Sequence, residues 1–170
     1  GIDPEGELAH LLVHQRGSNI RFSGRLGEHN VSPSNSSNLE KWARYPLAGY
    51  VVLGSNGEMP YLSEVEKLRY FEATRKLIPS GKRFMAGCGC ESAHSTIALV
   101  KQAAALGADV ALLITPCYYK SKMDAAGLSH YFLAVADASP IPVSLYNMPA
   151  NTTVDMPADL VVNGEIVARA

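Results

Sequence analysis

The sequence has little of several residue types that mark specialised classes of protein. Its three cysteines are an odd number without the spacing of a disulfide framework, so a reducing compartment fits best. Its 15 basic and 16 acidic residues leave a formal net charge of −1 with no basic block, which argues against nucleic acid as a partner. No apolar run has the length of a membrane span, and the acidic N-terminus does not resemble a secretory signal. We therefore expect no nucleic acid and no membrane among its partners.

The sequence also lacks the common motifs that bind phosphates and metals. The glycine-rich stretch Gly54–Glu58 (GSNGE) has neither the lysine of a P-loop nor the GxGxxG of a dinucleotide site, and it holds a single carboxylate. Cys88, Cys90 and His94 match no strong zinc spacing. Cys88 lies in an apolar run, where a buried thiol is expected. We predict no metal and no cofactor.

What the sequence does have is a repeating pattern of apolar runs. The chain is 170 residues long and 47% hydrophobic, enough for one domain with a core. Strand-like runs recur about every 30 residues, the size of one βα unit. These runs span residues 49–53, 84–88, 109–115 and 141–146. Nearly continuous apolar strands favour a parallel sheet buried on both faces.

Helical patterns fill the gaps between these runs. Ser63 and Glu66 have the spacing of a capping box. The predicted helices span residues 63–77, 93–106 and 124–136, with a fourth from Pro157. This alternation predicts an α/β fold, either a (β/α)8 barrel or, as the second choice, a doubly wound sheet. Because a whole barrel needs about 250 residues, the chain is predicted to be part of one.

The first 46 residues read differently from the rest. Two helical patterns, over residues 7–15 and 38–45, flank a stretch rich in glycine, serine and asparagine. We interpret this stretch, about residues 20–37, as irregular and as a candidate insertion. The predicted division is an N-terminal helical segment over residues 1–46 and a partial barrel over residues 47–170.

Polar side chains gather where three of the predicted strands end. The segments are Gly54–Glu58, Thr115–Tyr119 and Tyr146–Thr153, and they offer hydroxyls, amides and backbone N–H groups without concentrated positive charge. In a barrel the carboxyl ends of the strands converge on one face, where active sites lie. A small anion such as a carboxylate fits the first segment, and so does a plain tight turn. The tyrosines either pack there or form a hydroxyl relay.

Taken together, these motifs resemble the pyruvate-dependent class I aldolase family of dihydrodipicolinate synthase and N-acetylneuraminate lyase. They are GSNGE with LSEVE, TPCYYKSK, and PIPVSLYNMPANT, and they are most similar to the 4-hydroxy-2-oxoglutarate aldolase branch. The resemblance implies a partial TIM barrel covering roughly strands two to five. It also implies a small-molecule 2-keto acid as ligand, no cofactor, a homo-oligomer (dimer or tetramer) for the full-length family, and a cytoplasmic or mitochondrial location.

The resemblance further implies a role for each of five residues. Ser55, Asn56 and Gly57 would bind the carboxylate of the pyruvate moiety. Ser55, Tyr119 and Tyr146 would form a proton relay, with Tyr146 also acting as general acid and base near a Schiff base. Tyr119 is often met at a subunit interface in this family.

The sequence departs from the family pattern at three positions. Asn56 and Asn151 stand where dihydrodipicolinate synthases carry threonine and arginine, and asparagine cannot supply the charged fork of arginine. The favoured reaction is therefore cleavage of 4-hydroxy-2-oxoglutarate to pyruvate and glyoxylate, with a 4-hydroxy-tetrahydrodipicolinate synthase-like reaction as the alternative. Thr153 replaces a glycine, so we predict strain there if the backbone needs a positive φ.

A fourth departure concerns the lysine that forms the Schiff base. The family carries it on the sixth strand, which falls beyond about residue 170 at one βα unit past Tyr146. The seven lysines of this chain all lie at or before Lys122. We therefore expect the catalytic lysine to be absent from this chain. A non-enzyme alternative follows, in which the chain binds keto acids without catalysis.

Overall fold

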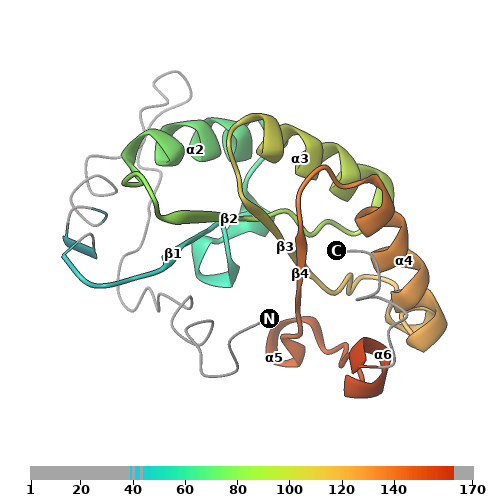
Figure 1. Ribbon diagram of the computed structural model, residues 1–170. Coiled ribbons are helices and arrows are strands. Elements are labelled where there is room, and N and C mark those ends of the chain that lie inside the picture. The colour runs from blue at the N-terminus through green and yellow to red at the C-terminus, as the bar shows by residue number, and fades with distance from the viewer. Residues whose placement is uncertain (1–38, 40, 43, 163–170) are drawn as a thin grey trace.

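The computed structural model describes residue 39, residues 41–42 and residues 44–162, and within this part the chain forms a parallel sheet of four strands (Figure 1). The strands are β1 (Gly49–Val52), β2 (Arg83–Gly87), β3 (Val110–Ile114) and β4 (Val143–Tyr146). They lie in the order β1-β2-β3-β4, so each strand pairs with its neighbours in sequence. This order is that of a barrel, because a doubly wound sheet reverses its strand order part-way.

Helices connect the strands and begin where the local sequence predicts. The longer helices are α2 (Glu64–Leu77), α3 (Ala93–Ala105) and α4 (Ala125–Ala138); α5 (Pro149–Thr152) and α6 (Ala158–Val162) are short, as are the 3-10 helices η2 (Ser55–Gly57), η3 (Met59–Tyr61) and η4 (Lys120–Lys122). The predicted capping box of Ser63 and Glu66 is present at α2. Ser92 and Asp124 cap α3 and α4 with their side chains. These caps satisfy N–H groups that a helix start leaves unpaired.

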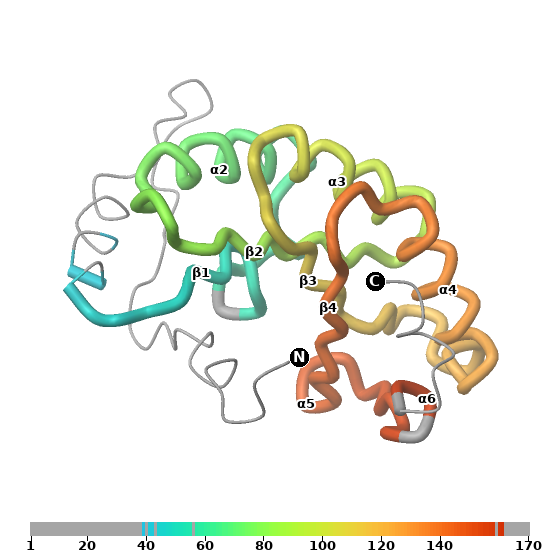
Figure 2. The backbone as a smooth tube through the Cα atoms, in the orientation of Figure 1, coloured from blue at the N-terminus to red at the C-terminus, as the bar shows by residue number. Residues whose placement is uncertain are grey.

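The core lies between the sheet and the three longer helices. Figure 2 shows α2, α3 and α4 running along one side of the strands, with α5 and α6 beyond the end of β4. Phe71, Phe84 and Phe132 are fully buried in this core. In β3, Ala111 and Leu113 are buried while the alternate residues keep partial exposure. Because successive side chains of a strand point to opposite faces, the helices cover one face of the sheet more than the other.

The predicted strands and the first three predicted helices are confirmed, with ends that differ by one or two residues. The helix expected from Pro157 is present as α6, and residue 158 is its first. The segment after β4 also contains the short helix α5, for which the sequence patterns gave no prediction. Pro149 stands in its first turn, where the fixed φ of proline suits a helix start.

The predicted N-terminal segment lies largely outside the described residues. Of the helix expected over residues 38–45, residues 39, 41 and 42 are helical. The helix expected over residues 7–15 and the irregular stretch at 20–37 fall outside, so the division at residue 46 stays a prediction. Within the part of the chain that the structure describes, no helix is both long and apolar enough to cross a membrane.

Candidate active site

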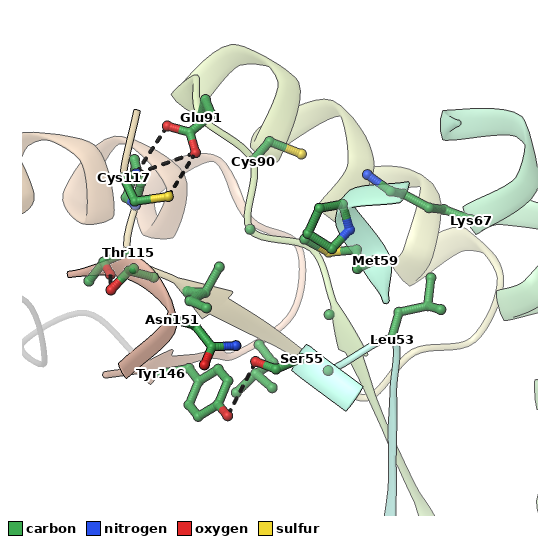
Figure 3. A pocket seen from close by; sticks show the side chains of 18 residues that line it. Leu53, Ser55, Met59, Lys67, Cys90, Glu91, Thr115, Cys117, Tyr146 and Asn151 are labelled. Carbon is green, nitrogen blue, oxygen red and sulfur yellow. Dashed lines mark hydrogen bonds between the residues drawn. The ribbon is translucent and has the colours of Figure 1, made fainter. Parts of the chain in front are cut away.

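The carboxyl ends of the strands surround a cavity of about 380 Å³ (Figure 3). All four strand ends contribute to its wall. The lining residues at these ends are Leu53, Gly54 and Ser55 after β1, Gly89, Cys90 and Glu91 after β2, Thr115, Pro116 and Cys117 after β3, and Tyr146, Asn151 and Thr152 at β4 and beyond. This is the edge of a parallel barrel sheet at which active sites are built.

The segment after β1 has a backbone shape that its neighbours impose. Leu53 has a φ of 58° and Glu58 a φ of 53°, in the left-handed region that side chains rarely adopt. A Cβ on Gly87 of β2 would collide with the Leu53 carbonyl oxygen, so this glycine permits the two backbones to approach. The Gly57 N–H closes η2 by donating to the Gly54 carbonyl at 2.8 Å. Strained backbone of this kind persists where the surroundings enforce it, often at functional sites.

Ser55, at the start of η2, meets Tyr146 at the end of β4. The Ser55 Oγ donates to the Tyr146 hydroxyl at 3.4 Å, although 91 residues separate the two in sequence. This is longer than the usual O–H···O distance of about 2.7–2.8 Å. Catalytic hydrogen bonds often tighten only when substrate is bound. The structure thus brings two predicted site residues together in the cavity wall.

Tyr119, the other predicted member of the relay, lies apart from this pair. Tyr119 is 71% exposed and Tyr118 is 76% exposed, and neither lines the cavity. Their rings pack edge to face, with centroids 5.0 Å apart. Ser55 lies beside Tyr146, whereas Tyr119 lies at the surface. The relay of three residues therefore stays a prediction.

Buried hydroxyls tie α5 to the end of β3. The Thr115 hydroxyl donates to the Thr152 Oγ1 at 3.1 Å, and the Thr152 hydroxyl also reaches the Val154 carbonyl at 3.0 Å. Thr153 follows with a φ of 56°, which confirms that this position takes the left-handed conformation. A β-branched residue in that conformation carries local strain. The strained residue directly follows two residues of the cavity wall, Asn151 and Thr152.

Two charged residues of the cavity wall were not predicted from the sequence. Lys67 of α2 lines the end away from Ser55 and Tyr146 (Figure 3). Glu91 lies at the rim, where its carboxylate accepts hydrogen bonds from the N–H groups of Cys117 and Tyr118. Glu91 stands in the stretch GCES, which directly follows the second predicted strand. Nothing local in the sequence indicates either contact.

The three cysteines are packed thiols. Cys88 is buried, as predicted, and burial raises its pKa to about 12. Burial also raises the pKa values of Cys90 and Cys117, and the Glu91 carboxylate adds to the rise at Cys117. Thiols with raised pKa values are weak nucleophiles near neutral pH. Among the described residues, no three metal-binding side chains cluster in a way that could hold an ion.

Comparison with known proteins adds to this geometry. Residues 36–164 match the profile of the dihydrodipicolinate synthetase family. The chain belongs to this family. An L-threo-3-deoxy-hexylosonate aldolase from Hypocrea jecorina is 41% identical over 135 residues, which cover 76% of this chain and 43% of the relative. A probable mitochondrial 4-hydroxy-2-oxoglutarate aldolase from Emericella nidulans is 43% identical over 130 residues, which cover 71% of this chain and 42% of the relative.

A solved member of the dihydrodipicolinate synthetase family shows the same architecture. The pyruvate complex of the dihydrodipicolinate synthase from Acinetobacter baumannii aligns with a TM-score of 0.72 and 33% sequence identity, over 76% of this chain and 44% of that one. The chain therefore spans less than half the length of these relatives. The sheet described here is that of a partial barrel of this family, which confirms the predicted fold class.

Proposed function

We propose that this chain carries the keto-acid-binding part of a class I, pyruvate-dependent aldolase. The observation behind the proposal is the hydroxyl pair of Ser55 and Tyr146 at strand ends, in a chain whose family includes a solved pyruvate complex. Ser55 and Asn56 bind the keto-acid carboxylate through a hydroxyl and the N–H groups at the start of η2. The Gly57 N–H is occupied within η2, so Gly57 acts by closing the turn.

Proton transfer is the second part of the proposal. In class I chemistry a lysine amine forms an imine with the keto carbon, and the imine accepts the electron pair of the breaking C–C bond. Tyr146 exchanges a proton with the reacting group, and Ser55 passes that proton onward through the contact they share. Tyr119 completes the relay from a subunit interface of a homo-oligomer, which suits its 71% exposure.

The proposed substrate is 4-hydroxy-2-oxoglutarate, cleaved to pyruvate and glyoxylate. Asn151 supports it, because this neutral side chain lines the cavity where dihydrodipicolinate synthases carry arginine. The relative named as a 4-hydroxy-2-oxoglutarate aldolase supports it too. The similarity to a solved dihydrodipicolinate synthase favours a synthase-like reaction as the second candidate. The location follows the same proposal and is cytoplasmic or, as in that relative's name, mitochondrial.

The Schiff-base lysine is proposed to be absent from this chain. Among the described residues, Lys67 is the lysine that lines the cavity, and it comes from α2 and not from a strand end. Figure 3 places its side chain away from the Ser55–Tyr146 pair. The chain on its own would then bind a keto acid without turning it over, which is the non-enzyme alternative.

Pyruvate binding tests the site. Pyruvate is titrated into isotope-labelled chain, and amide signals of residues 55–57 are expected to shift. The variants Ser55→Ala and Tyr146→Phe should each weaken binding about five- to tenfold, the effect of losing one hydrogen bond. Tyr45→Phe is the control, since Tyr45 is 62% exposed and outside the cavity wall. Unchanged signals at residues 55–57 would rule out the proposed site.

Borohydride reduction tests the missing lysine. Chain mixed with pyruvate and then reduced should show no mass increase of a pyruvyl adduct on any lysine. The matched variant Lys67→Met checks the cavity-lining amine, and it should behave as the wild type does. A pyruvyl adduct on any lysine would show that the chain carries its own Schiff-base residue. Loss of that adduct in Lys67→Met would identify Lys67, and an adduct that persists would be on another lysine.

A further inference from the structure

Glu91 links two segments of the cavity rim that are far apart in sequence. It lies between β2 and α3, and its carboxylate accepts hydrogen bonds from the segment after β3, 26 and 27 residues further along the chain. The proposed reaction has no role for this side chain. Its contacts with Cys117, shown by dashed lines in Figure 3, tie it to the segment that carries the tyrosine motif.

The contacts use most of the accepting capacity of a carboxylate. The Cys117 N–H donates to Oε2 at 3.0 Å and to Oε1 at 3.3 Å. The Tyr118 N–H donates to Oε2 at 2.9 Å, and the Cys117 thiol donates to Oε1 at 3.4 Å. A glutamine at position 91 has the same length but a single accepting oxygen. A glutamine could therefore accept from the two N–H groups with its one oxygen, but it would lose the contacts that Oε1 makes with Cys117.

The backbone of Cys90, the residue before Glu91, is held by a hydrogen-bonded group in the core. The Tyr131 hydroxyl of α4 donates to the Cys90 carbonyl at 2.8 Å, and the Cys90 N–H donates to the Thr96 Oγ1 at 3.0 Å. Tyr131 and Thr96 share a further bond at 2.7 Å, and both side chains are buried. A continuous series of contacts thus runs from α4 through the Cys90 backbone to Glu91. From Glu91 it continues to an exposed segment.

We propose that Glu91 is a positioning residue, whose carboxylate sets the conformation of the segment Cys117–Tyr119 at the rim of the cavity. The identity of the ligand in that cavity rests on the proposed function, whereas the positioning rests on the contacts alone. The consequence for the site is that Pro116 and Cys117 form a fixed wall. Tyr119, two residues on, starts from a defined backbone position.

Amide hydrogen exchange tests the positioning. In Glu91→Gln, exchange at the Cys117 and Tyr118 amides should be about five- to tenfold faster, because bonds to a charged acceptor at an exposed site are replaced by weaker ones. Exchange in β2 and β3 should not change. The matched control is Glu72→Gln, which removes an exposed carboxylate that bonds Lys76 on α2. Unchanged exchange at residues 117 and 118 in the Glu91 variant would overturn the proposal.

The alkylation rate of Cys117, followed against pH by mass spectrometry, separates this role from general loosening. Burial and then the Glu91 carboxylate raise the pKa of this thiol, while Lys120 lowers it. In Glu91→Gln the midpoint of the rate profile should therefore move to lower pH, with the effect of Lys120 retained. A faster rate with an unmoved midpoint would mean that the carboxylate does not contact the thiol, and would also overturn the proposal.

The two proposals fail separately. If pyruvate shifts no amide signal of residues 55–57 in the wild type, the proposed function fails. The exchange and alkylation measurements use no ligand, so they still test the role of Glu91. If pyruvate binds but neither measurement responds to Glu91→Gln, the site stands and the positioning role is wrong.

Discussion

The segment after β1 and the segment after β3 both border the cavity, yet different forces hold them in place. Leu53–Glu58 is held by its backbone, with two left-handed residues, a turn bond to Gly54 and close contact with Gly87. Cys117–Tyr119 is held by a carboxylate from another loop, and its tyrosines are largely exposed. The first segment changes shape only if the sheet does. The second is set by one side chain and is easier to alter.

Gly87→Ala should have the largest effect, and it acts on the first segment. The new methyl would collide with the Leu53 carbonyl, so β1 or β2 must shift. We expect a loss of about 3 kcal/mol in the free energy of unfolding, measured by chemical denaturation. Gly57→Ala is the control, since its Cβ would meet Leu53 Cδ2 at an ordinary 3.6 Å. Equal losses in both variants would mean that close backbone approach does not hold the first segment.

Tyr131→Phe weakens the support of the second segment instead. It removes a buried hydroxyl that bonds the Cys90 carbonyl and Thr96, so about 1–2 kcal/mol of stability should be lost. Tyr50→Phe is a matched control: Tyr50 is 3% exposed, and its hydroxyl has no hydrogen-bond partner among the described residues. That variant should be neutral or slightly stabilising. The free energy of unfolding of both variants is measured by chemical denaturation. An equal loss of stability in the two would mean that the hydrogen bonds of the Tyr131 hydroxyl do not support the second segment.

Thr153→Gly tests backbone strain outside both segments and should have the smallest effect. Relief of the left-handed conformation is partly offset by the greater freedom of glycine in the unfolded chain. We expect a net gain of about 0.5 kcal/mol in thermal or chemical denaturation. Thr153→Ala keeps a Cβ at the φ of 56° and should gain less. A loss of stability in the glycine variant would show that the Thr153 hydroxyl, which bonds the Thr152 carbonyl at 2.6 Å, matters more than strain.

Much of the scaffold was predictable because its signals are local. Apolar runs mark the strands, and Ser63 with Glu66 marks the start of α2 within four residues of sequence. The left-handed conformation at Thr153 was predictable because the resembling family has glycine there. The meeting of Ser55 with Tyr146 also came from the resemblance, since no periodic pattern relates residues 91 positions apart.

The rest of the site depends on contacts between distant segments. In sequence, Glu91 is an acidic residue after a strand, a position at which a solvated side chain is common. Its contact with the Cys117 N–H could not be predicted because it forms only in the folded chain. Lys67 reads as one residue of an amphipathic helix, and only the packing of α2 turns it toward the cavity wall. The Tyr131 hydroxyl bonds a carbonyl 41 residues earlier, so its role cannot be found in its own helix.

The sequential order of the strands has a consequence for how the chain acquires its structure. Gly49 pairs with Arg83, Met85 with Val110 and Ala111 with Val143, so partners lie only about 25 to 35 residues apart. Each pairing therefore closes a loop of about one βα unit, and the entropic cost of closing such a loop grows only slowly with its length. Because two strands alone are marginally stable, we expect no pairing to persist until all four strands pack against α2, α3 and α4, so hydrogen exchange during refolding should show the strands becoming protected together.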